Sequence, residues 1–202
     1  AGPVLRECLG SQFATTRAAA ARGLVRVAGS EAIPDLVPLL SDPEAQVRRA
    51  AAESLSGMGE TAAAPALEVL SGENGPGCIA AGDVLAATGA GLVPELLEVL
   101  RSGGPDSRAG AARALGGVGD EQAVAHLVGR IRDSHAPVRA EAARALGLLH
   151  AASAAPHLLG AIDDPDSAVS RAAIDALGRI GAPAADALLK RLITPDGAIR
   201  DD

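Results

Sequence analysis

Residues 138–147 read VRAEAARALG, and variants of this stretch recur along the whole chain of 202 residues. Six leucines mark the same point of each copy, 30 or 31 residues apart: Leu24, Leu55, Leu85, Leu115, Leu146 and Leu177. Alanine stands four residues before each of them, and positions four apart share one side of a helix. Seven residues before the leucine, four copies carry arginine and two carry another residue: Arg17, Arg48, Arg108 and Arg139, then Cys78 and Ser170. The stretch therefore predicts six copies of one helix, the first helix of each repeated unit.

Glycine and Asp-Pro pairs indicate where the first helices end and begin. Four residues after the leucine stand glycines whose left-handed backbone would close the helix: Gly59, Gly89, Gly119 and Gly181. Ala28 and His150 take this place in the first and fifth units. At the other end, Asp42-Pro43 and Asp164-Pro165 predict an N-cap carboxylate followed by proline at the first helical position.

A second helix is predicted in the other half of each unit. Its apolar stripe has two positions per unit: Leu36, Leu67, Leu96, Leu127, Leu158 and Leu189, then Leu40, Leu70, Leu100, Ile131, Ile162 and Ile193. Proline stands two residues before the first of these leucines in four units and marks the first turn of the helix: Pro34, Pro65, Pro94 and Pro156. Two short helices leave an apolar face uncovered until the next unit packs on it.

We therefore predict an all-α fold, an α-α superhelix (a right-handed solenoid) of about six two-helix units in one array over residues 1–202. The units are expected at about 11–41, 42–73, 74–104, 105–133, 134–164 and 165–195, with 196–202 as the start of a seventh unit or a tail. The third unit departs most from the pattern, because glycines crowd residues 72–84. Two interpretations stay open there: sequence drift in a tolerant scaffold, or a hinge or ligand-accommodating notch.

Composition and charge narrow the function. Hydrophobic residues make up 48% of the chain, yet it has one Phe and no Trp or Tyr, so the core is built from small aliphatic side chains. The net charge of −7 argues against a protein that wraps a nucleic-acid duplex. Lys190 is the only lysine beside many arginines, a bias typical of a GC-rich genome. With two cysteines and no long apolar run, we expect a bacterial, cytoplasmic protein that does not cross a membrane.

Val47-Arg48, Ala51-Ala52 and Leu55, and again Val138-Arg139, Ala142-Ala143 and Leu146-Gly147, are similar to the HEAT-like repeat of the phycobilisome-lyase type. The resemblance covers residues 11–195. It implies an α-solenoid whose first helices form the convex side and whose second helices line the concave side.

The resemblance also implies that an inter-unit aspartate pairs with the arginine of the first helix that follows. Asp42 would then pair with Arg48, and Asp133 with Arg139, as parts of a structural ladder with Arg17 and Arg108. Cys78 interrupts this ladder in the third unit.

No residue set in the sequence predicts catalysis. The HEAT-like deoxyhypusine hydroxylases hold iron with His-Glu pairs, but no His-Glu dipeptide occurs in this chain and alanine, Ala140, precedes Glu141. A Gly-rich phosphate loop and a nucleophile elbow are also absent from the sequence, and neither cysteine has an evident base. We expect no catalytic, cofactor-binding or metal-binding residue.

The candidate partner-binding surface consists of polar positions on the second helices. Acidic residues come from the first three units and basic residues from the later ones: Asp35, Glu68, Glu95 and Glu98, then Arg130, Lys190 and Arg191. His126 and His157 each precede the leucine of a second helix, one unit apart, and are expected side by side. Solvated surface histidines and scattered surface charge are the alternative interpretation of these positions.

The sequence favours a noncatalytic interaction scaffold or regulatory module that binds a partner protein along the concave surface, and not nucleic acid or a membrane. The enzymatic alternative is a bilin lyase or isomerase subunit that handles a tetrapyrrole. Nucleic-acid binding of the kind found in HEAT-like alkylpurine glycosylases lacks the aromatic residues and positive charge that it needs. The pattern also leaves open that the chain is part of a longer protein or a larger assembly.

Overall fold

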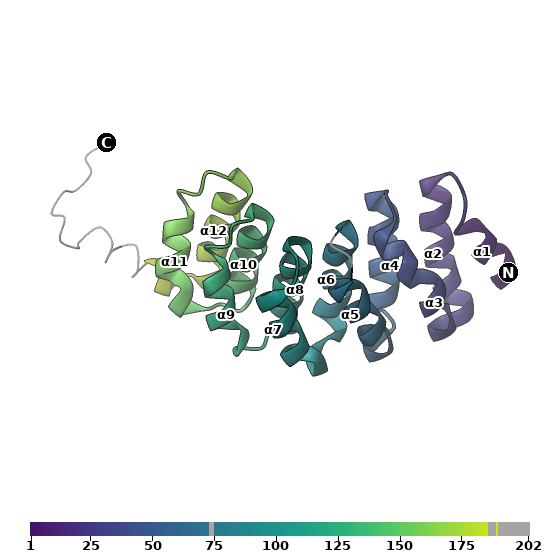
Figure 1. Cartoon of the computed structure of the whole chain (residues 1–202), viewed down its shortest axis with the longest axis horizontal. Coiled ribbons are helices and arrows are strands. Elements are labelled where there is room, and N and C mark those ends of the chain that lie inside the picture. Colours follow the sequence, from purple (N-terminus) through teal and green to yellow (C-terminus); the bar gives the residue numbers. More distant parts are fainter. Residues whose placement is uncertain (73–74, 186–188, 190–202) are drawn as a thin grey trace.

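The computed structural model describes residues 1–72, 75–185 and 189. Within these residues all regular structure is helical, which confirms the predicted all-α class. The helices stack side by side in a curved row, with the N-terminus at one end (Figure 1). The predicted right-handedness of this stack and the unit boundaries stay predictions.

The first helices are found in all six units: α2 (Ala14–Ala28), α4 (Ala45–Ser56), α6 (Pro76–Thr88), α8 (Pro105–Val118), α10 (Ala136–Leu148) and α12 (Ser167–Ile180). The second helices of the first five units alternate with them: α3 (Ile33–Leu36), α5 (Ala63–Ser71), α7 (Val93–Ser102), α9 (Ala123–Arg130) and α11 (Ala155–Ala161). A 3-10 turn over Val37–Ser41 extends α3. Most of the second helix expected in the sixth unit, including Ile193, lies outside the described residues.

One further helix was not predicted. α1 (Gly2–Cys8) packs against α2. Pro3, Leu5 and Leu9 repeat the spacing of Pro34, Leu36 and Leu40, so α1 has the pattern of a second helix. This match is the signal in the sequence that could have identified it. Arg6 of α1 is joined to Asp35 of α3 by an ion pair of 2.7 Å.

The helix ends differ in detail from the predictions. Gly59, Gly119 and Gly181 have the expected positive φ, and His150 adopts it too at +48°, but Gly89 has φ −90°. A Cβ at Gly89 would lie 2.6 Å from the Leu85 carbonyl oxygen, so close packing explains this glycine and a left-handed turn does not. Gly119 and Gly181 are the C-cap residues of α8 and α12 and confirm the predicted helix stop. α4 instead ends at Ser56 with Gly57 as its C-cap, so Gly59 lies beyond the helix end.

The predicted N-caps are wrong by two residues. α4 begins at Ala45 and α12 at Ser167, with Glu44 and Asp166 as their N-cap residues. Asp42 and Asp164 instead accept a hydrogen bond from the backbone N–H two residues later, in an Asx-type turn that precedes the helix.

The six marker leucines lie in the core, and five of them are fully buried. Around them the first helices approach one another closely because glycine and alanine line their contacts. A Cβ on Gly82 of α6 would lie 2.5 Å from the Gly110 carbonyl oxygen of α8. A Cβ on Gly116 would lie 2.7 Å from Ala145 of α10. In the irregular third unit, Gly82 is therefore a close-packing residue, and a Cβ on Gly77 would meet the Ser41 side chain.

The close contacts correct the prediction that the second helices line the concave side. Neighbouring first helices contact one another along their lengths, most of all α6 and α8, whereas neighbouring second helices contact little. A stack bends toward the row whose helices are more closely spaced. The first helices therefore line the inner, concave side, and the second helices form the outer side of the curve in Figure 1.

Candidate functional site

Three arginine–aspartate pairs each join a first helix to the loop that precedes the next first helix. In each pair the arginine makes two hydrogen bonds to an aspartate 25 residues later, with N–O distances of 2.7–2.9 Å. The pairs are Arg17 with Asp42, Arg108 with Asp133, and Arg139 with Asp164. This corrects the predicted partners. The carboxylate pairs with the arginine of the preceding first helix, because the loop that carries the aspartate lies beside that helix.

The predicted partners are also in contact, but through the backbone. Arg48 donates to the Asp42 carbonyl oxygen at 2.8 Å, and Arg139 donates to the Asp133 carbonyl oxygen at 2.9 Å. An arginine such as Arg139 therefore holds the loops at both ends of its unit. The guanidinium group of Arg139 thus donates to a backbone carbonyl oxygen as well as to a carboxylate.

The ladder is interrupted in the third unit, as predicted. Cys78 replaces the arginine, and glycine, Gly103, stands at the position 25 residues later. The Cys78 Sγ instead lies 3.5 Å from the Ser107 Oγ. Both members of the ion pair are absent at this joint, so no unpaired carboxylate is left behind there.

The ladder shifts the pKa of its carboxyl groups. Hydrogen bonds from Arg17 hold the pKa of Asp42 below its usual range, and those from Arg139 do the same to Asp164. Burial alone would raise the pKa of Asp133, but hydrogen bonds from Arg108 and the His135 backbone outweigh it and lower the pKa to about 2. These groups are ionised at neutral pH and stabilise the fold.

A second charge network lies on the inner face and was not predicted. All six positions two residues before the marker leucines are charged: Arg22, Glu53, Asp83, Arg113, Arg144 and Asp175. This regularity is the signal in the sequence that could have identified it. Arg113 donates to Asp83 at 2.8 Å and to the buried Glu141 at 2.8 Å, so it joins α6, α8 and α10. Burial alone would lower the pKa of Arg113, but these partners raise it above its usual range.

The network surrounds a shallow hollow on the inner face, the α6–α10 hollow, of about 330 Å³. Its lining combines charged and apolar residues: Asp83, Ala86, Arg113, Gly117, Glu141, Arg144, Ala145 and Leu148. Leu148 is 46% exposed, although it is a large apolar side chain. The hollow therefore offers an apolar floor with an ordered charged rim.

The structure places the described members of the predicted partner-binding surface on the row of second helices, and their binding role stays a prediction. Four are exposed or half-buried acids of the outer row, and two of these are paired: Asp35 with Arg6, and Glu98 with Arg101 at 2.6 Å. Glu68 and Glu95 are exposed. Arg130 is half-buried and lies 3.4 Å from Asp133. His126 and His157 are both exposed, and Lys190 and Arg191 lie outside the described residues.

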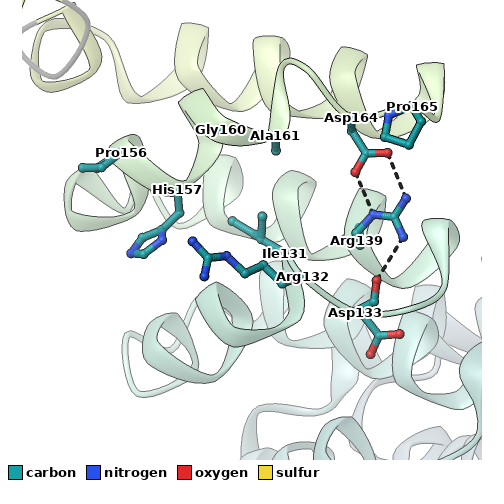
Figure 2. A pocket seen from close by; sticks show the side chains of 10 residues that line it. All are labelled: Ile131, Arg132, Asp133, Arg139, Pro156, His157, Gly160, Ala161, Asp164 and Pro165. Atoms are coloured by element: carbon teal, nitrogen blue, oxygen red, sulfur yellow. Dashed lines mark hydrogen bonds and ion pairs between the residues drawn. The ribbon is translucent and has the colours of Figure 1, made fainter. Parts of the chain in front are cut away.

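His157 lines a larger open groove, the α9–α11 groove, of about 700 Å³ (Figure 2). Its lining comes from the residues just after α9, from α10, and from α11 and the loop after it: Ile131, Arg132, Asp133, Arg139, Pro156, His157, Gly160, Ala161, Asp164 and Pro165. Figure 2 shows the Arg132 guanidinium pointing toward the His157 ring, while Arg139 is held by Asp164. His126 is not among the lining residues, so the predicted histidine pair does not share this groove.

In residues 1–72, 75–185 and 189, no group of three His, Cys, Asp or Glu could hold a metal ion. No single helix in this part of the chain is long and apolar enough to cross a membrane. α6 and the helical segment over Ala90–Ser102 are long and apolar enough only when taken together, and a bend of 111° separates them.

Comparison with known proteins identifies the repeat. The model of HEAT repeats matches residues 2–82 and 130–202, and the model of the PBS lyase HEAT-like repeat matches residues 107–133. A search of the curated proteins found no match.

Several solved structures share the fold. The chain is similar to the Escherichia coli protein YibA, with 16% identity, a TM-score of 0.62, and coverage of 96% of this chain and 76% of that one. It is also similar to a chain of the CpcE–CpcF complex of phycocyanin lyase from Nostoc sp. PCC7120, with 23% identity, a TM-score of 0.57 and coverage of 93% and 80%. Because the repeat models match most of the residues, the chain belongs to the family of HEAT-repeat proteins.

Proposed function

We propose that this protein is a noncatalytic interaction module that binds a partner protein along its inner face, the surface of the first helices. The observation that supports it is the α6–α10 hollow, where exposed Leu148 lies beside Arg113 and Arg144 in a concave, preorganised surface. Its volume of about 330 Å³ is at the lower end of the range of about 300–1,000 Å³ found for ligand pockets. The hollow can accept one or two apolar side chains of a partner.

The charged rim gives this surface its specificity. Arg113 is already oriented by Asp83 and Glu141, and Arg144 donates to Glu141 at 2.6 Å. Side chains held in this way lose little conformational entropy when a partner binds. Charges at the edge of an interface mainly select the partner and speed its approach, while an apolar anchor in the centre supplies affinity.

The test places a photo-crosslinking amino acid at two positions in cells that make the protein. Position 148 lies in the hollow on the inner face, and position 95, an exposed acid of α7, lies on the outer row. We expect one specific partner to be crosslinked from position 148 and not from position 95. Crosslinking from position 95 alone would contradict the inner-face assignment.

Variants then test the same surface by affinity. Leu148→Glu should weaken binding of the crosslinked partner at least tenfold, because it places a charge where the partner would bury an apolar side chain. Glu95→Arg is the matched control, a charge change on the outer row with no expected effect.

The bilin lyase alternative has a separate readout. Its support is the likeness of the fold to a chain of the CpcE–CpcF complex. A change in the absorption spectrum of phycocyanobilin on mixing with the protein would favour this alternative over the scaffold.

A further inference from the structure

The α9–α11 groove carries two basic side chains that nothing in the described part of the chain neutralises. Arg132 and His157 line the groove, and neither has a hydrogen bond or ion pair within the residues that the structure describes. Figure 2 shows the two side chains pointing toward each other across the groove. Both residues are exposed, so their donors face solvent.

The other charges of the groove are already paired. Asp164 accepts two hydrogen bonds from Arg139, at 2.7 and 2.8 Å. Asp133 accepts two from Arg108, at 2.8 and 2.9 Å. The carboxylates are therefore neutralised by the ladder, and the groove has unpaired positive charge in a protein whose net charge is −7.

An apolar strip lies beside the two basic residues. Ile131 and Ala161 are buried lining residues, and Pro156 and Pro165 border the groove. The volume of about 700 Å³ lies well within the range of about 300–1,000 Å³ for ligand pockets. The groove thus has hydrogen-bond donors for an anion at one end and an aliphatic surface beside them.

We propose that the α9–α11 groove is a second binding site, which takes an acidic peptide segment of a partner protein. A carboxylate of the segment lies between Arg132 and His157, and a neighbouring aliphatic side chain contacts Ile131 and Ala161. Guanidinium and imidazole N–H groups are strong donors to a carboxylate. A nucleic acid is the less suitable occupant, because the chain has one Phe and no Trp or Tyr on which bases could stack.

The probe is a fluorescein-labelled peptide of alternating leucine and glutamate, with both ends blocked, titrated into the full chain at low salt. The matched control peptide has glutamine in place of glutamate. We expect the glutamate peptide to bind at least fivefold more tightly. Amide resonances of Ile131, Arg132, His157 and Ala161 should shift on addition of the peptide in a ¹⁵N-labelled sample.

Three variants locate the binding. Arg132→Ala and His157→Ala should each weaken binding about threefold, the effect typical of an exposed ion pair. Arg26→Ala is the control, because Arg26 is an exposed arginine of α2 far from the groove. Unchanged thermal midpoints show that the variants are folded. The Leu148→Glu variant should bind the peptide normally, so failure of the inner-face proposal and failure of this one are distinguishable.

Several outcomes would overturn the proposal. Equal binding of the glutamate and glutamine peptides would show that the charge is not recognised. An equal loss in Arg26→Ala would show binding to net charge alone. Displacement of the peptide by inorganic phosphate at the same concentration as by acetylated glutamate would show a simple anion site without recognition of a peptide.

Discussion

Replacing Gly110 by alanine tests the claim that backbone contact between first helices holds the array together. A Cβ at this position would meet the Cys78 carbonyl oxygen of α6 and lie 2.6 Å from Leu70 Cδ1 and 2.9 Å from the Cys78 carbonyl carbon. Two of these three atoms belong to the backbone of α6, so they cannot rotate away. The methyl group fits only if α6 and α8 move apart.

The expected change in stability follows from two opposing terms. Alanine in place of glycine within a helix stabilises by about 0.5–1 kcal/mol, because the unfolded chain loses less entropy. Overpacking of a close contact destabilises by about 1–3 kcal/mol. Since the contact here is with backbone, the upper part of that range applies, and Gly110→Ala should lower the free energy of unfolding by about 1–2 kcal/mol. For a chain of this size the thermal midpoint should fall by about 2–8 °C.

Gly178→Ala is the matched control in α12. A Cβ at Gly178 has no atom within 4 Å, so only the entropic term remains and the midpoint should rise by about 1–4 °C. Thermal unfolding followed by circular dichroism at 222 nm, with urea unfolding beside it, measures both variants. If Gly110→Ala were as stable as the parent or more stable, the inferred backbone contact between α6 and α8 would be wrong.

The remaining predictions concern charge, burial and reactivity. Because the pKa of Asp133 is lowered to about 2 in the folded state, its stabilisation of about 2 kcal/mol is present above about pH 5 and lost as the pH falls toward 2. Asp133→Asn should therefore flatten that part of the curve of unfolding free energy against pH, and an unchanged curve would contradict the ion pair. Arg113→Gln should destabilise by about 1–2 kcal/mol, because it removes a partner of a buried carboxylate, whereas Arg22→Gln, in a pair of 3.5 Å with exposed side chains, should have almost no effect in urea unfolding. Cys8 should react with a thiol reagent in the native state and Cys78, which is 1% exposed, only on unfolding; equal rates would place Cys78 at the surface.

The ladder explains how the array stays continuous where the helices themselves are short. Each of the three arginine–aspartate pairs joins a first helix to the loop before the next first helix, and the same arginine donates to a backbone carbonyl in the loop before its own helix. Where the ladder is missing, at Cys78, the closest helix contact of the array is found instead, between α6 and α8. Close backbone packing thus takes the place of the ion pair at this joint.

The repeat, the helical class and the core could be read from residues alone. Leu55, Leu115 and Leu146 recur at a fixed period with alanine four residues before them, and burial follows from periodicity because each helix has one face toward its neighbours. The helix stops at Gly119 and Gly181 could also be predicted, because they depend only on a local backbone angle.

Tertiary structure decided what depends on distances between units. Asp42 stands six residues from Arg48 in the sequence, yet its carboxylate pairs with Arg17, because stacking brings the end of a unit beside the first helix of that same unit. Which row of helices lies inside the curve also depends on how closely Gly82 and Gly110 let α6 and α8 approach. Periodicity assigns each residue to a face of its own helix. The spacing between helices depends on the volumes of all the side chains at their contact, and which side chains meet there is known only from the packed structure.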